Sequence, residues 1–400
     1  MNNIKEDVTE MGLDPETWTD AAQDRLSRRG SIDQTDGRLG PGHGKASALT
    51  TTPPSLKERH IFTMGIVTKF FCTILCVAAQ YWYISIPGAL LVLLKMYNQM
   101  SMGIYKKDTM MNGKTVIITG ANSGLGEVTA LDMASRGARV IMACRDLGKA
   151  NGVRESIITK TNNHQVVVKK LDLASLDSVR EFAAQILDEE KHIHVLINNA
   201  GQGGILNRIT KDGLQLGMQV NYFGHFLLTN LLLGRIRDSA PSRIVNVSSV
   251  AHRYHKLDLN DLQCERNFND WTVYANAKLC NILMTTYLSE LLDGTGVTAN
   301  SVHPGIVATH AFDRLQRSSP WMYAIIMVIV KNFCKTPEQG AQAQIYAACD
   351  PDLDGVSGKY FQDCRESRCI APEAQDMRLA EQLWRKSVDL VKLTKSEINY

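Results

Sequence analysis

The chain has 400 residues, a formal net charge of +3 and 44% hydrophobic residues. This length suits a single α/β domain of about 250 to 290 residues with extra terminal segments, and the small, dispersed charge argues against a nucleic-acid-binding protein. The nine cysteines are unclustered and odd in number. Such a pattern is typical of thiols in a reducing compartment and excludes a disulfide framework or a zinc site, so no metal is expected.

Residues 1–60 mix acidic and basic side chains in near balance and carry hardly any apolar periodicity. We expect this segment to be a disordered polar tail. Within it, Ser31 follows Arg28, Arg29 and Gly30, so it is either a site for a basophilic kinase or an unmodified serine.

An abrupt change in composition follows at residue 61. The stretch from Phe70 to Leu94 carries no charge, and its 25 residues are enough to cross a bilayer. We therefore expect a transmembrane anchor at 61–95. The alternative, a buried core helix, is disfavoured by Pro87 and Gly88. The flanking basic residues leave the orientation open, although a glycosylation sequon at 246–248, on an expected core strand, favours a cytosolic catalytic domain.

From Lys114 onward, short apolar runs alternate with amphipathic stretches of helical length, which predicts a doubly wound parallel sheet of the Rossmann-like α/β class in one domain. The expected strands are Thr115–Thr119, Arg139–Cys144, Gln165–Leu171, Val195–Asn198, Arg243–Val247, Thr298–Val302 and Lys359–Phe361. The clearest expected helices are Leu125–Arg136, Asp177–Glu189, Leu214–Leu233, Thr272–Leu292 and Pro337–Cys349.

A glycine-rich turn joins the first expected strand to the first helix. It runs from Gly120 through Ser123, Gly124 and Leu125 to Gly126. Glycines allow the tight turn and let the backbone approach a pyrophosphate, which would then lie at the positive end of the helix. The turn therefore predicts a dinucleotide site, with a purely structural connection as the alternative.

The second expected strand ends without a carboxylate and is followed by Arg145 and Lys149. A cation at this place suits the 2′-phosphate of NADP, whereas a carboxylate would suit the ribose hydroxyl of NAD. NADP is therefore expected, and Asp146 keeps NAD as the alternative. After the third strand, Asp172 is expected to meet the adenine edge or to cap the next helix.

Tyr274 and Lys278 form the only Tyr-x-x-x-Lys pair in the chain. Residues four apart share a helix face, so we expect the Lys278 ammonium to lower the Tyr274 pKa from about 10 toward working pH. Such a hydroxyl can give or take a proton. Upstream, Ser248 and Ser249 end an expected strand, where neighbours point to opposite faces, so only one of them can reach a substrate.

These features resemble the short-chain dehydrogenase/reductase family, and within it the membrane-anchored retinol dehydrogenases of the branch that prefers NADP. The resemblance covers residues 111–392 as the catalytic domain. It rests on the segments Gly120–Gly126, Ala143–Asp146, Leu171–Leu173, Asn198–Gly201, Val220–Phe226, Arg243–His252, Tyr274–Leu279, His303–Val307 and Lys335–Ala341. An insertion around His252–Asp270 is similar to one in that branch. Ala277 departs from the small hydroxyl residue that is common before the lysine.

The resemblance implies that Asn221, Ser249, Tyr274 and Lys278 are catalytic. Ser249 would hydrogen-bond the substrate oxygen, Lys278 would hold the nicotinamide ribose, and Asn221 would complete a water-mediated proton relay. It also implies that NADP is held by residues from the whole domain, namely Gly120, Ser123, Gly124, Leu125, Gly126, Arg145, Lys149, Asp172, Asn199, Tyr274, Lys278, Val307 and Thr309.

The apolar run Pro320–Val330 is too short to span a membrane and corresponds to the family's lid over the substrate pocket; the alternative is a core helix. The resemblance thus implies an NADP(H)-dependent enzyme of retinol and retinal at an intracellular membrane, either the endoplasmic reticulum with a cytosolic catalytic domain or the mitochondrial membrane. Alternative substrates are sterols, isoprenoids or fatty aldehydes. The alternative hypothesis from a different functional class is a non-catalytic, NADP-binding scaffold protein. A homo-oligomer is left open.

Overall fold

The computed structural model describes residues 68–69, 72–74, 80–203, 207–266, 268–307 and 334–398. The chain divides into two compact units, Met1–Val77 and Ala78–Tyr400, and only a few residues of the first are described. The tail expected at 1–60, Thr309 and the apolar run at 320–330 lie outside the described residues.

The first long helix, α4, extends from Trp82 to Ser101. No helix in the described ranges combines the length and hydropathy needed to cross a membrane. Most of 61–81 lies outside the described residues, so the anchor expected at 61–95 stays a prediction. This helix includes Lys95, so its part before that lysine has 13 uncharged residues. At 1.5 Å per residue that part is about 20 Å long, against about 30 Å for a bilayer core.

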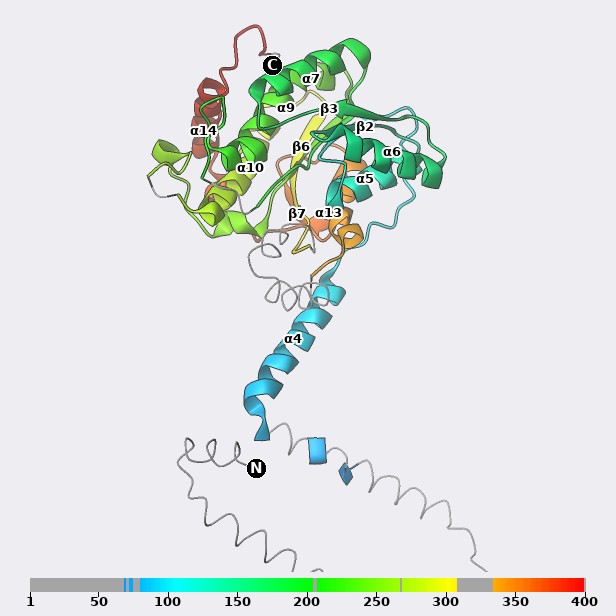
Figure 1. The fold of residues 1–400 in the computed structure, drawn as a ribbon, viewed down its shortest axis with the longest axis vertical. Coiled ribbons are helices and arrows are strands. Elements are labelled where there is room, and N and C mark those ends of the chain that lie inside the picture. Colours follow the sequence, from blue (N-terminus) through cyan, green and yellow to red (C-terminus); the bar gives the residue numbers. More distant parts are fainter. Residues whose placement is uncertain are drawn as a thin grey trace, which may run out of the picture. The chain divides into compact units, whose positions relative to one another are not determined.

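Within the part of the chain that the structure describes, eight strands form one sheet in the order β3-β2-β1-β4-β5-β6-β7-β8 (Figure 1). Strands β1 to β7 are parallel, and β8 is antiparallel to β7. Their bounds are β1 Thr115–Thr119, β2 Arg139–Cys144, β3 Val166–Lys170, β4 Val195–Asn198, β5 Ser242–Val247, β6 Val297–His303, β7 Tyr360–Gln362 and β8 Arg365–Glu366. This confirms the Rossmann-like parallel sheet. Its strand order reverses between β1 and β4, the place where open α/β sheets bind ligands.

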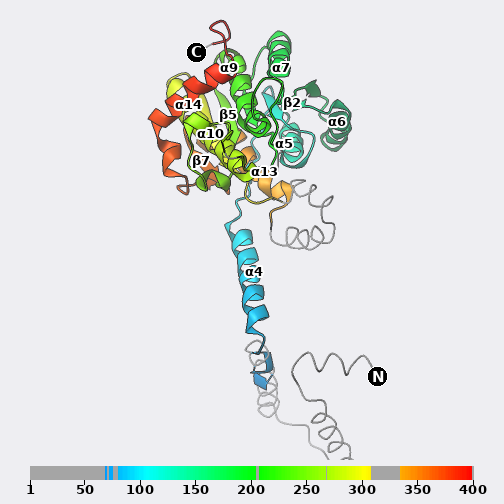
Figure 2. The ribbon, with the colours of Figure 1, turned by 60° about the vertical axis from the view of Figure 1, so that its left-hand side comes forward.

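Helices cover both faces of the sheet (Figure 2). Those packed on one face are α5 Gly124–Ser135, α6 Leu147–Thr161 and α13 Pro337–Cys349; those on the other are α7 Leu176–Glu189, α9 Gly224–Arg237 and α10 Asp270–Leu291, with α14 Met377–Leu390 packed on α10. Strand alternation divides the core accordingly. Ile117 packs with the α7, α9 and α10 layer, whereas its neighbours Val116 and Ile118 pack with the α5 and α13 layer.

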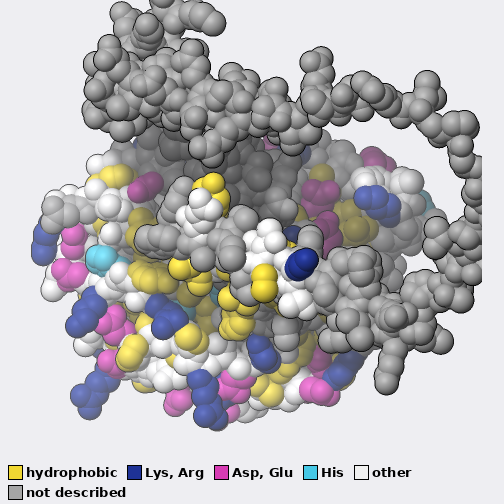
Figure 3. Space-filling view, turned by 90° about the horizontal axis from the view of Figure 1, so that it is seen from below, with side chains coloured by type: hydrophobic (Ala, Val, Ile, Leu, Met, Phe, Trp, Pro, Cys, Tyr) yellow, Lys and Arg dark blue, Asp and Glu magenta, His cyan; other side chains and the backbone are white. Residues whose placement is uncertain are grey.

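Shorter elements complete the unit. They are α8 Leu216–Met218, a π-helical turn Gln219–Phe223, the 3-10 helices Val250–Arg253, Leu259–Asp261, Pro351–Leu353 and Pro372–Gln375. The expected helix Leu214–Leu233 is therefore interrupted by the π-helical turn. Viewed from below, this unit carries charged side chains of both signs toward its rim and hydrophobic side chains nearer its centre (Figure 3).

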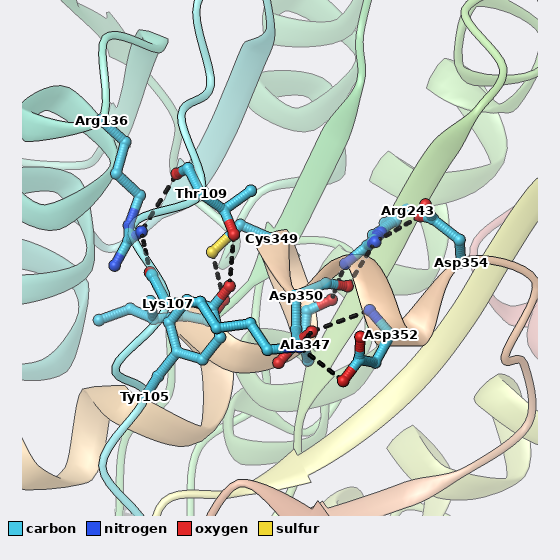
Figure 4. A network of polar contacts seen from close by, with 11 residues as sticks. Tyr105, Lys107, Thr109, Arg136, Arg243, Ala347, Cys349, Asp350, Asp352 and Asp354 are labelled. Carbon is cyan, nitrogen blue, oxygen red and sulfur yellow. Dashed lines mark hydrogen bonds and ion pairs between the residues drawn. The ribbon is translucent and has the colours of Figure 1, made fainter.

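The segment after α4 is fastened to the sheet domain ahead of the expected boundary at 111 (Figure 4). The Tyr105 ring is buried and lies 5.1 Å from the Arg136 guanidinium carbon. Arg136 also donates to the Lys107 carbonyl at 2.9 Å, and Lys107 Nζ lies 2.8 Å from the buried Asp350 carboxylate. These contacts fix residues 105–109 against α5 and the end of α13.

Candidate active site

The glycine-rich turn lies at the carboxyl end of β1, beside the reversal in strand order. Gly120 has φ +68, a left-handed conformation that glycine adopts without strain. A Cβ on Gly126 would lie 2.3 Å from the Gly120 carbonyl oxygen and 2.6 Å from Asn199 Nδ2. The next helix, α5, begins at Gly124, and Ser123 at its cap makes no side-chain hydrogen bond. The amides of the first turn therefore remain open to an anion.

Thr119, the last residue of β1, ties this turn to the end of β4. Its Oγ1 accepts hydrogen bonds from the amides of Asn199 and Ala200, both at 2.9 Å. Asn199 Nδ2 returns a bond to the Thr119 carbonyl at 2.8 Å. Since both lone pairs of the hydroxyl are engaged, its proton is directed to His225 Nε2 at 2.9 Å. Burial lowers the pKa of His225 to about 3, so this ring accepts as a neutral group.

The end of β2 presents cations to solvent. Arg145 and Lys149 are both exposed. Asp146 is the cap of α6 and accepts from the Lys149 amide at 3.0 Å, so one of its oxygens is already engaged by the backbone. Lys170, at the end of the neighbouring β3, donates to the Arg145 carbonyl. Sequence reasoning missed Lys170, because the pairing of Cys144 with Lys170 is a matter of sheet register.

Asp172 lies half-buried just after β3. Its Oδ1 accepts from the Ala174 amide at 3.0 Å, and its own amide donates to Ser178 Oγ at 3.0 Å. The cap of α7 is Ser175. Asp172 therefore shapes the turn before the helix and does not cap the helix itself.

The two adjacent serines after β5 point in different directions. Ser248 is buried and donates to the Lys278 carbonyl at 2.7 Å. Ser249 is half-buried, accepts from the Ala251 amide at 3.2 Å and lies near enough to the Tyr274 hydroxyl to lower its pKa. The structure thus brings Ser249, and not Ser248, to Tyr274.

A buried histidine that sequence reasoning did not single out orients the Ser249 backbone. His252 Nε2 accepts from the Ala371 amide at 3.1 Å. Its Nδ1 therefore carries the proton and donates to the Ser249 carbonyl at 2.6 Å. Only the fold brings Ala371 to this ring, so spacing in the sequence held no signal for it.

Tyr274 and Lys278 share one face of α10, as expected, with Lys278 Nζ 5.6 Å from the Tyr274 ring centroid. The ammonium donates to the Val247 carbonyl at 2.8 Å. Burial lowers the pKa of Lys278 to about 8. Burial also raises the pKa of Tyr274, and the nearby Ser249 side chain opposes that rise. The expected lowering of the tyrosine pKa by the lysine is therefore not found: desolvation dominates, and the ammonium is directed to a carbonyl.

Asn221 lies in the π-helical turn, a distortion that often occurs at functional sites. Its side chain is committed to the backbone: Oδ1 accepts from the Gln202 amide at 2.8 Å, and Nδ2 donates to the Gln202 and Gly217 carbonyls, both at 2.9 Å. A Cβ on Gly201 would lie 3.2 Å from Asn221 Oδ1 and 3.4 Å from Lys278 Nζ. Glycine there lets the two groups lie close to the end of β4.

Val307 lies after β6 and is held between Lys335 and Gly340. It forms an isolated parallel bridge with Lys335, whose amide donates to the Ile306 carbonyl at 2.8 Å. A Cβ on Gly340 of α13 would lie 2.5 Å from Val307 Cγ2 and 2.7 Å from Leu125 Cδ2, so Val307 packs beside the glycine-rich turn. Among the described residues, no group of three or more His, Cys, Asp or Glu side chains could hold a metal ion.

This chain is similar to known proteins in both sequence and structure. Residues 114–319 match the family described as short chain dehydrogenase. Retinol dehydrogenase 12 of Bos taurus is 44% identical over 289 residues, 72% of this chain and 90% of that protein. Retinol dehydrogenase 13 of Homo sapiens is 45% identical over 287 residues, 70% of this chain and 85% of that protein. The crystal structure of an uncharacterised Mycobacterium paratuberculosis protein has a TM-score of 0.57 at 33% identity and covers 71% of this chain and 95% of its own.

Proposed function

The chain belongs to the short-chain dehydrogenase family and is one of its oxidoreductases, and we propose that it uses NADP(H) to interconvert a hydrophobic alcohol and its aldehyde. The observation that carries this proposal is the grouping of Ser249, Tyr274 and Lys278 at the carboxyl end of the sheet, beside the glycine-rich turn.

The residues present fit a dinucleotide. The space that a Cβ of Gly126 would fill is closed by backbone, so the turn brings main-chain amides to its surface, and the open first turn of α5 suits a pyrophosphate. We assign the 2′-phosphate to Arg145 and Lys149, with Lys170 close by. The capping bond to Asp146 supports NADP over NAD, because it engages one carboxylate oxygen and holds the side chain at the start of α6.

When bound, the nicotinamide supplies or accepts the hydride. In the protein, the Tyr274 hydroxyl gives the proton to the carbonyl oxygen in reduction and takes it back in oxidation. Ser249 hydrogen-bonds the same oxygen, and Lys278 supplies a positive charge behind the tyrosine. The raised pKa of Tyr274 keeps its hydroxyl protonated at neutral pH, which is the form that reduction requires.

For the substrate we propose a long apolar aldehyde, with retinal as the first candidate because the relatives are named as retinol dehydrogenases. Exposed aromatic side chains support an apolar substrate. Trp271 is 53% exposed, and its ring centroid lies 6.2 Å from that of Tyr274 and 6.3 Å from that of Tyr254. These rings would give an apolar chain a surface next to the reacting oxygen.

We further propose that α4 attaches the protein to an intracellular membrane, with the catalytic unit on the cytosolic side of the endoplasmic reticulum. Leu90 and Leu93 are both 61% exposed, and a helix that exposes large apolar residues is suited to a lipid surface. Replacing both with Gln should reduce co-flotation with vesicles. Unchanged flotation of that variant would assign membrane attachment to another part of the chain.

The deciding experiment incubates the full-length protein with NADPH and either retinal, a fatty aldehyde, an isoprenoid aldehyde, a sterol ketone or a short aldehyde. Tyr274→Phe should lower turnover by about 100-fold or more while NADPH still binds. Tyr346→Phe on α13 is the matched control and should retain activity. A protein that binds NADPH but turns over none of these compounds would be the non-catalytic scaffold. More than a few per cent of residual activity in Tyr274→Phe would refute the assignment of the acid/base.

A further inference from the structure

The Lys278 ammonium shares its carbonyl acceptor with a second donor. One turn further along α10, Asn281 Nδ2 lies 3.3 Å from the Val247 oxygen that accepts from Lys278. The same nitrogen lies 3.2 Å from the main-chain oxygen of Asn221. An amide nitrogen has two hydrogens, so one side chain bridges the end of β5 and the π-helical turn. Asn281 is itself buried.

Asn281 also stands at the end of a buried ladder of hydrogen bonds. Its carbonyl accepts from Thr285 Oγ1 at 2.8 Å. That hydroxyl accepts from Asn246 Nδ2 at 2.9 Å, and Asn246 Oδ1 accepts from Asn198 Nδ2 at 2.8 Å. The ladder therefore links β4, β5 and α10 and sets the position of α10 along the strands. A buried polar network favours the arrangement that pairs most of its members, although Asn198 Oδ1 has no partner among the described residues.

We propose that Asn281 is a positioning residue of the active site: by holding the Val247 and Asn221 carbonyls together, it sets where the Lys278 ammonium lies relative to Tyr274. This inference rests on the proposed function. The Val247 carbonyl couples the two side chains, because it accepts hydrogen bonds from both Lys278 and Asn281. Without Asn281, the π-helical turn and the end of β5 lose their direct link, and the ammonium can follow the freed carbonyl.

The test uses two substitutions of Asn281 and one matched control. Asn281→Leu removes both donors at similar volume. It should lower kcat for aldehyde reduction by about 10- to 100-fold, as a small misplacement of a catalytic group does, with the NADPH dissociation constant changed less than about threefold. The control is Asn230→Leu on α9, a buried Asn whose Nδ2 donates to Phe226 within its own helix. It should keep kcat within about twofold of the original protein, whatever its effect on thermal stability.

Asn281→Asp tests the pH dependence of kcat/KM, which should not change if Asn281 only stabilises the fold. The two distances to the Val247 oxygen place the nitrogens of Lys278 and Asn281 within about 6 Å of each other. A carboxylate at that range favours the charged lysine and should move the alkaline limb of kcat/KM upward by about 1 to 3 pH units. An unmoved limb, or Asn281→Leu with the kcat of Asn230→Leu, would overturn the inference.

Failure of the proposed function would look different. A protein with no turnover on any aldehyde would contradict the function, and Asn281 could then be tested by stability alone. In that case the pH range over which Lys278 alters folding stability should move upward in Asn281→Asp. The same range in both proteins would overturn the inference independently of activity.

Discussion

Lys278→Met should leave the folded protein as stable or more stable at neutral pH and should make it less stable at alkaline pH. Burial lowers the pKa of Lys278 from its ordinary 10.5 to about 8, which corresponds to about 3 kcal/mol disfavouring the charged lysine in the folded state. Methionine fills similar space without a charge. It also removes the hydrogen bond to Val247, and a bond from a charged donor contributes about 1.5 to 3 kcal/mol. The net gain at pH 7 should therefore lie between zero and about 2 kcal/mol.

The pH dependence is the sharper part of this prediction. Between pH 8 and 10.5 the unfolded chain keeps the lysine proton that the folded protein has lost, so the original protein gains stability as pH rises through this range. The stability of Lys278→Met relative to that of the original protein should thus fall by about 3 kcal/mol across this range, so the substitution becomes destabilising at its alkaline end. Urea unfolding at pH 7, 8, 9 and 10 measures this, with exposed Lys160→Met as the control. A difference that stays flat with pH would refute the claim that the ammonium is buried at an energetic cost.

Three further substitutions test the site. Gly126→Ala should weaken NADPH binding in a fluorescence titration by about tenfold or more, because its Cβ would meet the Gly120 carbonyl. The control is Gly152→Ala in α6, where a Cβ would meet no atom within 4 Å and NADPH affinity should not change. Equal NADPH affinities of the two variants would contradict the packing argument. Arg145→Gln should raise the KM for NADPH by about 10- to 100-fold and leave that for NADH nearly unchanged; equal effects would remove Arg145 from the 2′-phosphate site. Trp271→Ala should lower kcat/KM for long apolar aldehydes more than for short ones, and a uniform loss would show that the ring does not contact the substrate chain.

The strands could be predicted from the sequence because each one is specified by a short run of neighbouring residues. Buried β-branched runs such as Thr115–Thr119 report strands directly, and β1, β2 and β4 have the expected bounds. The glycine-rich turn lies between such a run and a helix, and steric exclusion at Gly126 explains why glycine stands there. Alternation along a strand showed that Ser248 and Ser249 must differ in direction. It could not say which one faces the tyrosine, and that answer comes from the bond between Ser248 and the Lys278 carbonyl.

What could not be predicted depends on contacts between distant segments. Asn281 is one polar residue among several on α10, and its role depends on two carbonyls that lie 34 and 60 residues earlier in the chain. The fastening of Tyr105 and Lys107 ahead of residue 111 likewise depends on Arg136 and Asp350, which the fold brings to them.

The prediction that the Tyr274 pKa is lowered was wrong because it took no account of burial. Helical spacing correctly brought Lys278 to the tyrosine, but spacing carries no information about desolvation. Burial moves the two groups in opposite directions, the lysine pKa down to about 8 and the tyrosine pKa up. In the protein alone, the lysine therefore loses its proton before the tyrosine does, which reverses the order of their ordinary values. An alkaline limb of kcat/KM near pH 8 would consequently belong to Lys278, because kcat/KM reports the groups of the free enzyme. This is why a carboxylate at residue 281 is expected to move that limb upward.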